Sequence, residues 1–182
     1  MNYYAVQVKT RGEKKYIRLF RAVNPDCPVA IYFPTRKLSV RRRGAMVQTT
    51  PAVFPGYIFL ETDGHETLRR WHWRFRRTDG FFRFLKSNRD IRPLEGRDLE
   101  TALHFIKKTG PLAQAGISRV YFDEEARIVV VDGPLAGLEG NIVKVDKRKG
   151  RAKIKLDLYG DSFTIDLGFE MMGKAASPRL KF

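Results

Sequence analysis

The spacing of apolar residues in the first 110 positions changes repeatedly between the period of a strand and the period of a helix. Runs rich in strand-forming residues predict strands at 4–8, 29–33 and 57–60. Apolar residues spaced by three or four predict helices at 13–24, 68–75 and 97–108. Elements of this length and order favour an α+β fold, in which an antiparallel sheet packs against flanking helices as an α/β sandwich.

Two local signals refine this picture. Thr10 and Glu13 fit a capping box at the start of the first helix, with Glu13 reaching back to the cap. Residues 37–48 resemble a hairpin with Arg41, Arg42, Arg43 and Gly44 at its tip.

The rest of the chain contains little that looks helical. Strand-like runs predict strands at 127–131, 140–145, 151–156 and 162–165, with turn residues between them. Residues 153–158 alternate strictly between polar and apolar, so one face of that strand is buried and the other is wet. About five short strands in about 55 residues predict a small closed barrel, which removes exposed sheet edges.

The distribution of charge changes near residue 110, where the pattern of apolar residues also changes from mixed helix and strand to strand alone. Residues 1–110 hold 23 basic and 10 acidic residues, whereas residues 111–182 hold 12 and 10. Residues 109–116 contain Gly and Pro with little charge, which is typical of a linker. We therefore expect an N-terminal domain, a linker, a barrel and a tail at 1–109, 110–118, 119–173 and 174–182.

Composition narrows the class of partner. The 182 residues carry a net charge of +15, which favours a polyanion, nucleic acid before an anionic membrane. No apolar run approaches the roughly 20 residues that span a bilayer, and we expect no signal peptide and no membrane contact. Cys27 is the single cysteine, so no internal disulfide can form and a cytoplasmic location is the default.

The most specific local signal lies at 131–146. Gly133, Gly137 and Gly140 suit turns that need positive φ, and Pro134 fixes its own φ. A phosphate-binding loop would need a Gly-Lys-Ser/Thr ending and a following helix, and neither is present. The spacing, followed by alternating strands, resembles the KOW motif of small SH3-like barrels.

A second signal, Phe54-Pro-Gly-Tyr-Ile-Phe-Leu-Glu61, is a turn that feeds an aromatic strand. It follows Tyr3-Tyr-Ala-Val-Gln7 and precedes Asp79-Gly-Phe-Phe-Arg-Phe-Leu85 and the KOW-like segment. In this order the motifs resemble the NusG family of transcription elongation factors over roughly residues 3–171. The combination is far more specific than any one motif.

The resemblance implies an N-terminal domain that binds the clamp helices of RNA polymerase through an apolar, aromatic surface. The polymerase-binding candidates are Tyr4, Phe54, Tyr57 and Phe59. Positions 57 and 59 share one face of a strand, and that face is either surface, as we expect for Tyr57, or core. Specialised members also contact polymerase from the start of the second helix, near His65.

The resemblance also implies that the KOW barrel recruits Rho or a ribosomal protein. The family pattern has an aromatic residue after Gly-Pro, where this chain has Leu135. Tyr159-Gly160 retains the aromatic-Gly pair that the family carries later in the barrel. The departure at Leu135 weakens this expectation.

Basic residues form three runs that are candidates for nucleic-acid binding. The hairpin run is Arg41, Arg42 and Arg43. The second-helix run is Arg69, Arg70, Arg76 and Arg77, with Trp73 either stacking on an unpaired base or half buried. The barrel run, net +6 over twelve residues, is Lys144, Lys147, Arg148, Lys149, Arg151, Lys153 and Lys155. Such lines of charge can neutralise phosphates.

The basic profile resembles the LoaP-type specialised paralogs, which promote antitermination and recognise an RNA hairpin. We expect a monomeric transcription elongation or antitermination factor that binds RNA polymerase and nascent RNA. The alternatives are a housekeeping NusG, a ribosome-associated KOW protein and an architectural DNA-binding protein. Catalysis, a metal site and a cofactor are not expected, because the three histidines are scattered and no nucleophile has a recognisable base.

Overall fold

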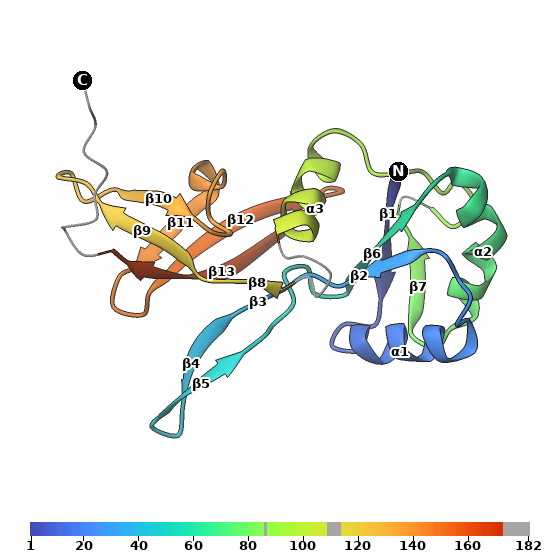
Figure 1. Ribbon diagram of the computed structural model, residues 1–182, viewed down its shortest axis with the longest axis horizontal. Coiled ribbons are helices and arrows are strands. Elements are labelled where there is room, and N and C mark those ends of the chain that lie inside the picture. Colours follow the sequence, from blue (N-terminus) through green and yellow to red (C-terminus); the bar gives the residue numbers. More distant parts are fainter. Residues whose placement is uncertain (86, 109–113, 173–182) are drawn as a thin grey trace.

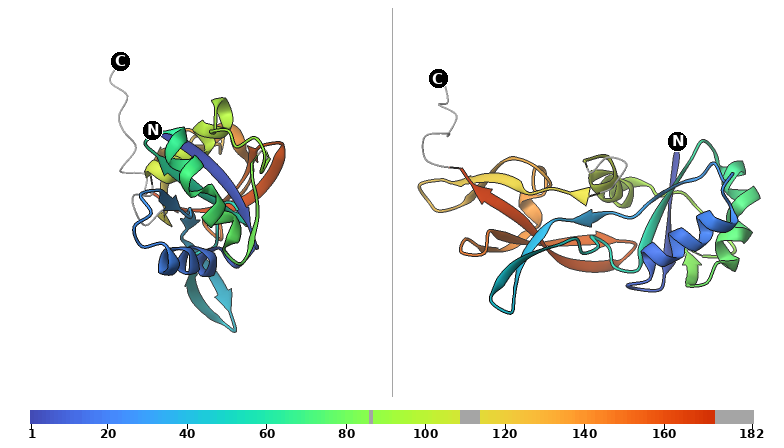
Figure 2. Two further views of the ribbon diagram at one scale, coloured as in Figure 1. Left: turned by 90° about the vertical axis from the view of Figure 1, so that its right-hand side faces the viewer. Right: turned by 60° about the horizontal axis from the view of Figure 1, so that its bottom comes forward.

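The computed structural model describes residues 1–85, 87–108 and 114–172. Two sheets lie at opposite ends of an elongated molecule, with helix α3 (Gly96–Lys108) between them (Figures 1 and 2). The mixed α/β fold class predicted from the sequence is confirmed.

The N-terminal sheet has four antiparallel strands in the order β2-β6-β1-β7. Their bounds are Asn2–Val8 for β1, Ala30–Tyr32 for β2, Tyr57–Thr62 for β6 and Phe81–Phe84 for β7. Helices α1 (Glu13–Val23) and α2 (His65–Arg77) cover one face of it. Strand periodicity sends Tyr4, Val6, Ile58 and Leu60 into this helix-side core, where Phe20 and Phe75 stack 3.9 Å apart.

The predicted capping box at Thr10 and Glu13 is wrong. Helix α1 begins after Gly12, and among the described residues no side chain caps it. Buried Glu13 instead accepts a hydrogen bond of 2.7 Å from the backbone N–H of Gly56, in the turn before β6. The carboxylate satisfies a buried loop donor, which stabilises the structure more than an exposed cap would.

The predicted hairpin is confirmed. Strands β4 (Leu38–Arg42) and β5 (Ala45–Thr49) pair antiparallel, and their tip extends away from both sheets (Figure 1). Its base contacts the C-terminal sheet, since the Arg151 guanidinium donates to the carbonyl of Ser39.

The C-terminal sheet has five strands in the order β10-β9-β13-β12-β11. Their bounds are Ser118–Phe122 for β9, Ile128–Asp132 for β10, Ile142–Asp146 for β11, Arg151–Leu158 for β12 and Asp161–Met171 for β13. Strand β13 pairs antiparallel with β12 and then parallel with β9, and the sheet curves as a half-barrel whose edges are β10 and β11. The predicted closure of the barrel is therefore wrong: among the described residues β10 and β11 do not pair, and the apolar face of the sheet packs against the N-terminal part instead. A short 3-10 helix, Glu139–Asn141, precedes β11.

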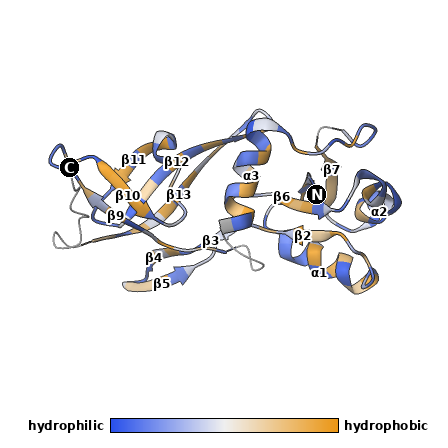
Figure 3. Ribbon diagram, turned by 45° about the horizontal axis from the view of Figure 1, so that its top comes forward, coloured by the Kyte–Doolittle hydropathy of each residue, from blue (hydrophilic) through white to orange (hydrophobic). Residues whose placement is uncertain are grey.

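The two sheets share one core. Strand β3 (Thr35–Arg36) pairs parallel with β8 (Gln114–Ala115). Strand β8 lies within the segment predicted as the linker. Helix α3 packs its buried Ala102 and Phe105 into a cluster that runs from the second face of the N-terminal sheet to the half-barrel, here called the shared core. Figure 3 shows α3, with its mixture of apolar and polar residues, between the two sheets.

Candidate functional site

The four candidate aromatic residues are buried and belong to two clusters. Tyr4 lies in the helix-side core, and its hydroxyl is 3.0 Å from Nδ1 of His65. Phe54, Tyr57 and Phe59 lie in the shared core, on the opposite face of the sheet. The structure therefore does not join Tyr4 to the other three rings.

The C-terminal sheet covers the face that carries Phe54 and Tyr57. The ring of Phe163 on β13 packs edge-on against both, with centroids 5.6 Å apart in each pair. Tyr57 is only 3% exposed, so its expected surface position is wrong for this arrangement. Helices α1 and α2 leave this sheet face uncovered, and burying its apolar area against the half-barrel is favourable.

A polar contact closes the same interface. The Tyr57 hydroxyl donates a hydrogen bond of 2.6 Å to Oδ2 of Asp161. Burial, followed by this hydrogen bond and the Asp161 charge, raises the pKa of Tyr57 to about 12. The neutral phenol is thus the form that this interface holds.

Further hydrogen bonds join the two parts of the chain. The Nε of Arg36 donates to the carbonyl of Asp166 at 2.8 Å, and burial lowers the pKa of this guanidinium to about 10. Oδ1 of Asp98 on α3 accepts from the N–H of Tyr159 at 2.9 Å. Leu135 is fully buried in the shared core. Of the barrel positions that the resemblance assigns to partner recruitment, Tyr159 is therefore bonded to α3 and Leu135 is not accessible at the surface.

The KOW-like turn behaves as predicted at two of its three glycines. Gly133 and Gly137 have φ values of +93° and +84°. Gly140 lies in the 3-10 helix without a positive φ, so that prediction was wrong. Pro134 is buried, and its carbonyl lies 2.7 Å from Nε2 of His104 on α3. The turn is thus part of the contact between the two parts.

Replacing Gly133 with alanine should lower the free energy of unfolding by roughly 2–4 kcal/mol. A Cβ at this position would lie 2.6 Å from Cα of Ser118, in addition to requiring a positive φ. Gly137→Ala is the matched control, because its φ is similar but its Cβ would meet no atom within 4 Å. Urea unfolding measures both; an equal loss in the two variants would contradict the steric argument.

Two of the three basic runs meet in one place. A hollow of about 480 Å³, here called the basic groove, separates the β4–β5 hairpin from the turn after β11. It is lined by Ser39, Val40, Arg41, Met46, Arg148, Lys149 and Arg151. These residues come from both parts of the chain, so the arrangement of the two parts creates the groove.

The remaining barrel lysines do not line the groove, and all four are exposed. Lys144 lies opposite Lys153 in the β11–β12 register, and Lys153 and Lys155 are both exposed on the face away from the core, as predicted. The Nζ of Lys147 lies 3.8 Å from the ring centroid of Phe122, a cation–π contact. Arg42 and Arg43 are exposed at the hairpin tip.

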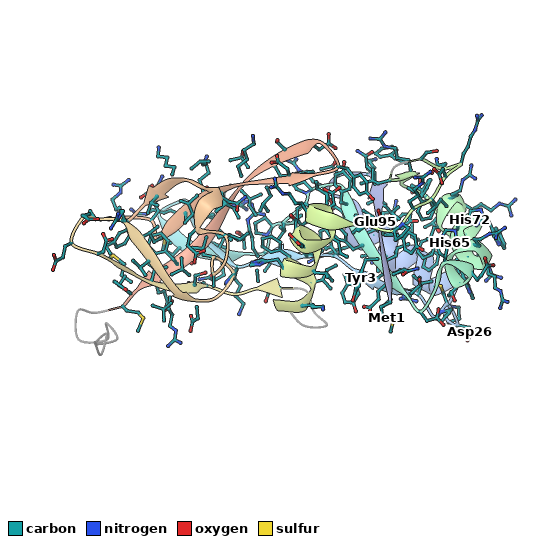
Figure 4. All side chains as sticks on the ribbon, turned by 90° about the horizontal axis from the view of Figure 1, so that it is seen from above. Met1, Tyr3, Asp26, His65, His72 and Glu95 are labelled. Carbon is teal, nitrogen blue, oxygen red and sulfur yellow. The ribbon has the colours of Figure 1, made fainter. Side chains whose placement is uncertain are left out.

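The second-helix run stands apart from the other two. Arg69, Arg70, Arg76 and Arg77 are exposed on α2, at the end of the molecule far from the half-barrel (Figures 1 and 2). Figure 4 shows His65 and His72 at this same end. One continuous nucleic-acid surface therefore cannot include all three runs without bending around the molecule.

Sequence reasoning missed the residues that close the interface. Phe163 was predicted only as part of a strand, and neither Asp161 nor Arg36 was singled out. The continuation of strand alternation to Phe163, beyond the core positions Ile165 and Leu167, is the one signal that could have indicated an additional apolar contact.

Within 1–85, 87–108 and 114–172, no three His, Cys, Asp or Glu side chains are grouped to hold a metal ion. In the same residues, no helix is both long and apolar enough to cross a bilayer.

Comparisons with known proteins agree on one family. Residues 1–103 match the family model described as transcription termination factor nusG. The transcription termination/antitermination protein NusG of Thermus thermophilus is 26% identical over 150 residues, covering 80% of each chain. That of Helicobacter pylori strain 26695 is 22% identical, covering 92% of this chain and 94% of its own. A solved structure, described as domain interaction in Thermotoga maritima NusG, matches 92% of this chain with a TM-score of 0.45 and 15% identity.

Proposed function

Because the chain belongs to the NusG family and is a transcription factor of that kind, we propose that it binds RNA polymerase and increases the processivity of transcription. The observation that supports this most directly is the aromatic face of the N-terminal sheet, formed by Phe54, Tyr57 and Phe59. Large aromatic residues dominate the energetics of protein interfaces. The clamp helices of polymerase are the element that this face would bind.

Polymerase binding through this face requires the half-barrel to move away, because Phe163 occupies it. The chain then has a closed arrangement, with the rings covered, and an open one, with the rings free. Binding only the open arrangement lowers the apparent affinity in proportion to the fraction of open chain. A separate condition applies to the polymerase: the factor favours elongation only if it binds the elongating polymerase more tightly than the paused polymerase.

The basic groove supports contact with nascent RNA, and specifically with a leader hairpin, as in a specialised antitermination factor. Cations of the groove would bind phosphates, which position an RNA without reading its sequence. The two walls of the groove belong to different parts of the chain, so movement of the half-barrel away from the N-terminal part would separate them. Arg41 would then stay exposed on the hairpin wall and Arg148 on the half-barrel wall. Tethering to RNA raises the local concentration of the factor near polymerase.

Retention of core polymerase tests the polymerase-binding surface. In full-length chain carrying Phe163→Ala, which uncovers the rings, adding Tyr57→Ala should reduce polymerase affinity roughly 30-fold, the equivalent of about 2 kcal/mol. The Phe163→Ala background is necessary, since Tyr57→Ala alone would both open the chain and remove the contact.

Phe82→Ala in the same background is the matched control, because Phe82 is a 58% exposed ring of the N-terminal sheet outside the shared core. It should leave polymerase affinity unchanged. Equal affinity with and without the Tyr57 ring would mean that Tyr57 is not part of the polymerase-binding surface.

Failure of every variant to bind polymerase, with retention on ribosomal RNA, would favour a ribosome-associated KOW protein. Equal binding to a leader hairpin and a scrambled hairpin would favour a housekeeping NusG.

A further inference from the structure

The basic groove is bounded by both parts of the chain, and each part contributes cations to it. Arg41 lies on the wall formed by the β4–β5 hairpin, while Arg148, Lys149 and Arg151 lie on the half-barrel wall. Arg41, Arg148 and Lys149 are exposed to solvent. An extended anion that enters the groove can therefore contact cations of the two parts at the same time.

The positive charge of the groove is largely uncompensated. Within the described residues, no Asp or Glu lines it. Lys149 pairs with Asp146 at 3.6 Å, but no ion pair of the described chain includes Arg41, Arg148 or Arg151. Like charges that face each other across an interface repel, so the closed arrangement carries an electrostatic cost at this position.

One hydrogen bond already joins the two walls. The Arg151 guanidinium donates to the carbonyl of Ser39, at the base of the hairpin. Nε of the same guanidinium is the one buried side-chain nitrogen or oxygen that has no hydrogen-bond partner among the described residues. The charge of Arg151 is thus held where the walls meet, with part of its donor capacity unused. A phosphate beside this guanidinium would accept a charge-assisted hydrogen bond.

The two walls stay together only while the half-barrel lies on the N-terminal part. The contacts of Phe163 and Asp161 with Tyr57, which hold it there, lie outside the groove. If they open, Arg148 and its neighbours leave with the half-barrel, and Arg41 remains with the hairpin. A nucleic-acid strand then meets fewer cations in one place, and its affinity falls with the number of phosphates that are neutralised.

We propose that RNA bound across the basic groove joins the hairpin to the half-barrel and so holds the chain closed, with the result that RNA binding and polymerase binding oppose each other. The closed arrangement binds the RNA backbone more tightly because cations of both walls then surround one segment of it. Such coupling is reciprocal, so RNA and polymerase each lower the affinity for the other by the same factor. This inference rests on the proposed function, because it takes the groove as the RNA-binding surface and the aromatic face as the polymerase-binding surface.

Two measurements on the full-length Phe163→Ala chain test the coupling, because this variant weakens the closed arrangement. Donor and acceptor fluorophores are placed at exposed positions of α1 and of the turn between β9 and β10, outside the groove. A saturating amount of hairpin RNA should shorten the distance between the labels. The same RNA should lower the affinity for core polymerase roughly 10-fold, within the roughly 5- to 150-fold range that is usual for coupled sites.

Arg41→Gln and Arg42→Gln are a matched pair of variants in this background. Both residues are exposed neighbours on β4 and carry the same charge, but only Arg41 lines the groove. Arg41→Gln should remove most of the closure and most of the effect on polymerase affinity, whereas Arg42→Gln should retain both. Equal losses in the two variants would overturn the proposal, because overall charge and not a bridge between the walls would then be responsible.

RNA binding by anisotropy and polymerase retention, each measured alone, separate this inference from the proposed function. If RNA binds but the labels do not approach each other, the bridge is wrong although RNA binding stands. If RNA does not bind, the bridge and the RNA contact both fail, while polymerase retention still tests the aromatic face. If polymerase is not retained even without RNA, the opposition between the two ligands fails with the aromatic face, and the label distance alone decides whether RNA closes the chain.

Discussion

Replacing Phe163 with alanine is expected to raise the affinity of the full-length chain for core RNA polymerase roughly 10- to 100-fold. The Phe163 ring contacts both Phe54 and Tyr57, and truncating a partly buried phenylalanine removes roughly 1.5–3 kcal/mol of packing. That energy stabilises the closed arrangement, in which polymerase cannot reach the rings. Each 1.4 kcal/mol lost from the closed state makes the open state about tenfold more populated relative to it, until the open state dominates.

Phe122→Ala controls for damage to the half-barrel. Phe122 is a partly buried ring of the same sheet that packs against Phe169, with no contact to Phe54 or Tyr57 among the described aromatic pairs. It should lower the stability of the sheet without raising polymerase affinity. If Phe163→Ala separates the two parts, as seen by an interdomain distance label, yet leaves polymerase affinity unchanged, then the rings are not the binding surface.

Neutralising the basic groove should produce the second large effect. The double variant Arg41→Gln, Arg148→Gln removes one cation from each wall of the groove. Its affinity for a hairpin RNA at 0.1 M salt should fall roughly 10- to 100-fold, and the slope of log affinity against log salt should decrease by roughly 1.5–2. Filter binding or fluorescence anisotropy over a range of salt measures both quantities.

The double variant Lys14→Gln, Arg18→Gln removes the same total charge from exposed positions on α1. Because these positions lie away from the groove, the slope should change little. Equal losses in the two variants would mean that the overall charge of the chain, and not the groove, attracts RNA. The comparison is made without polymerase, where the walls of the groove stay together.

Local elements were predictable wherever one chain segment determines its own structure. The hairpin tip at Arg43-Gly44 formed where expected, and the stripe of Leu68 and Phe75 became the buried face of α2. Lys153 and Lys155 point to solvent because successive side chains of a strand lie on opposite faces of the sheet, and Ile154 between them is buried. Strand β9 was missed, since its start lies in a stretch assigned to the linker.

Contacts between distant segments were not predictable in the same way. The alternation of β6 shows that Tyr57 and Phe59 share a face of the strand. It does not show that Phe163, more than 100 positions later in the chain, packs against Tyr57 on that face. Likewise, Glu13 has the right spacing for a cap, yet the buried N–H of Gly56 is a stronger competitor for its carboxylate. The residues that form these contacts are visible in the sequence, but which of them contact each other in the fold is not.

Strand β11 has a consequence beyond nucleic-acid contact, because it is an edge of its sheet. An unpaired edge is a template on which a second copy of the chain could add a strand, and Val143, 58% exposed, would favour such growth. Lys144 beside it, with the cations of the following turn, repels another copy carrying the same charges. We therefore expect the positive charge of this edge to oppose aggregation as well, and a polyanion that masks it to remove that protection.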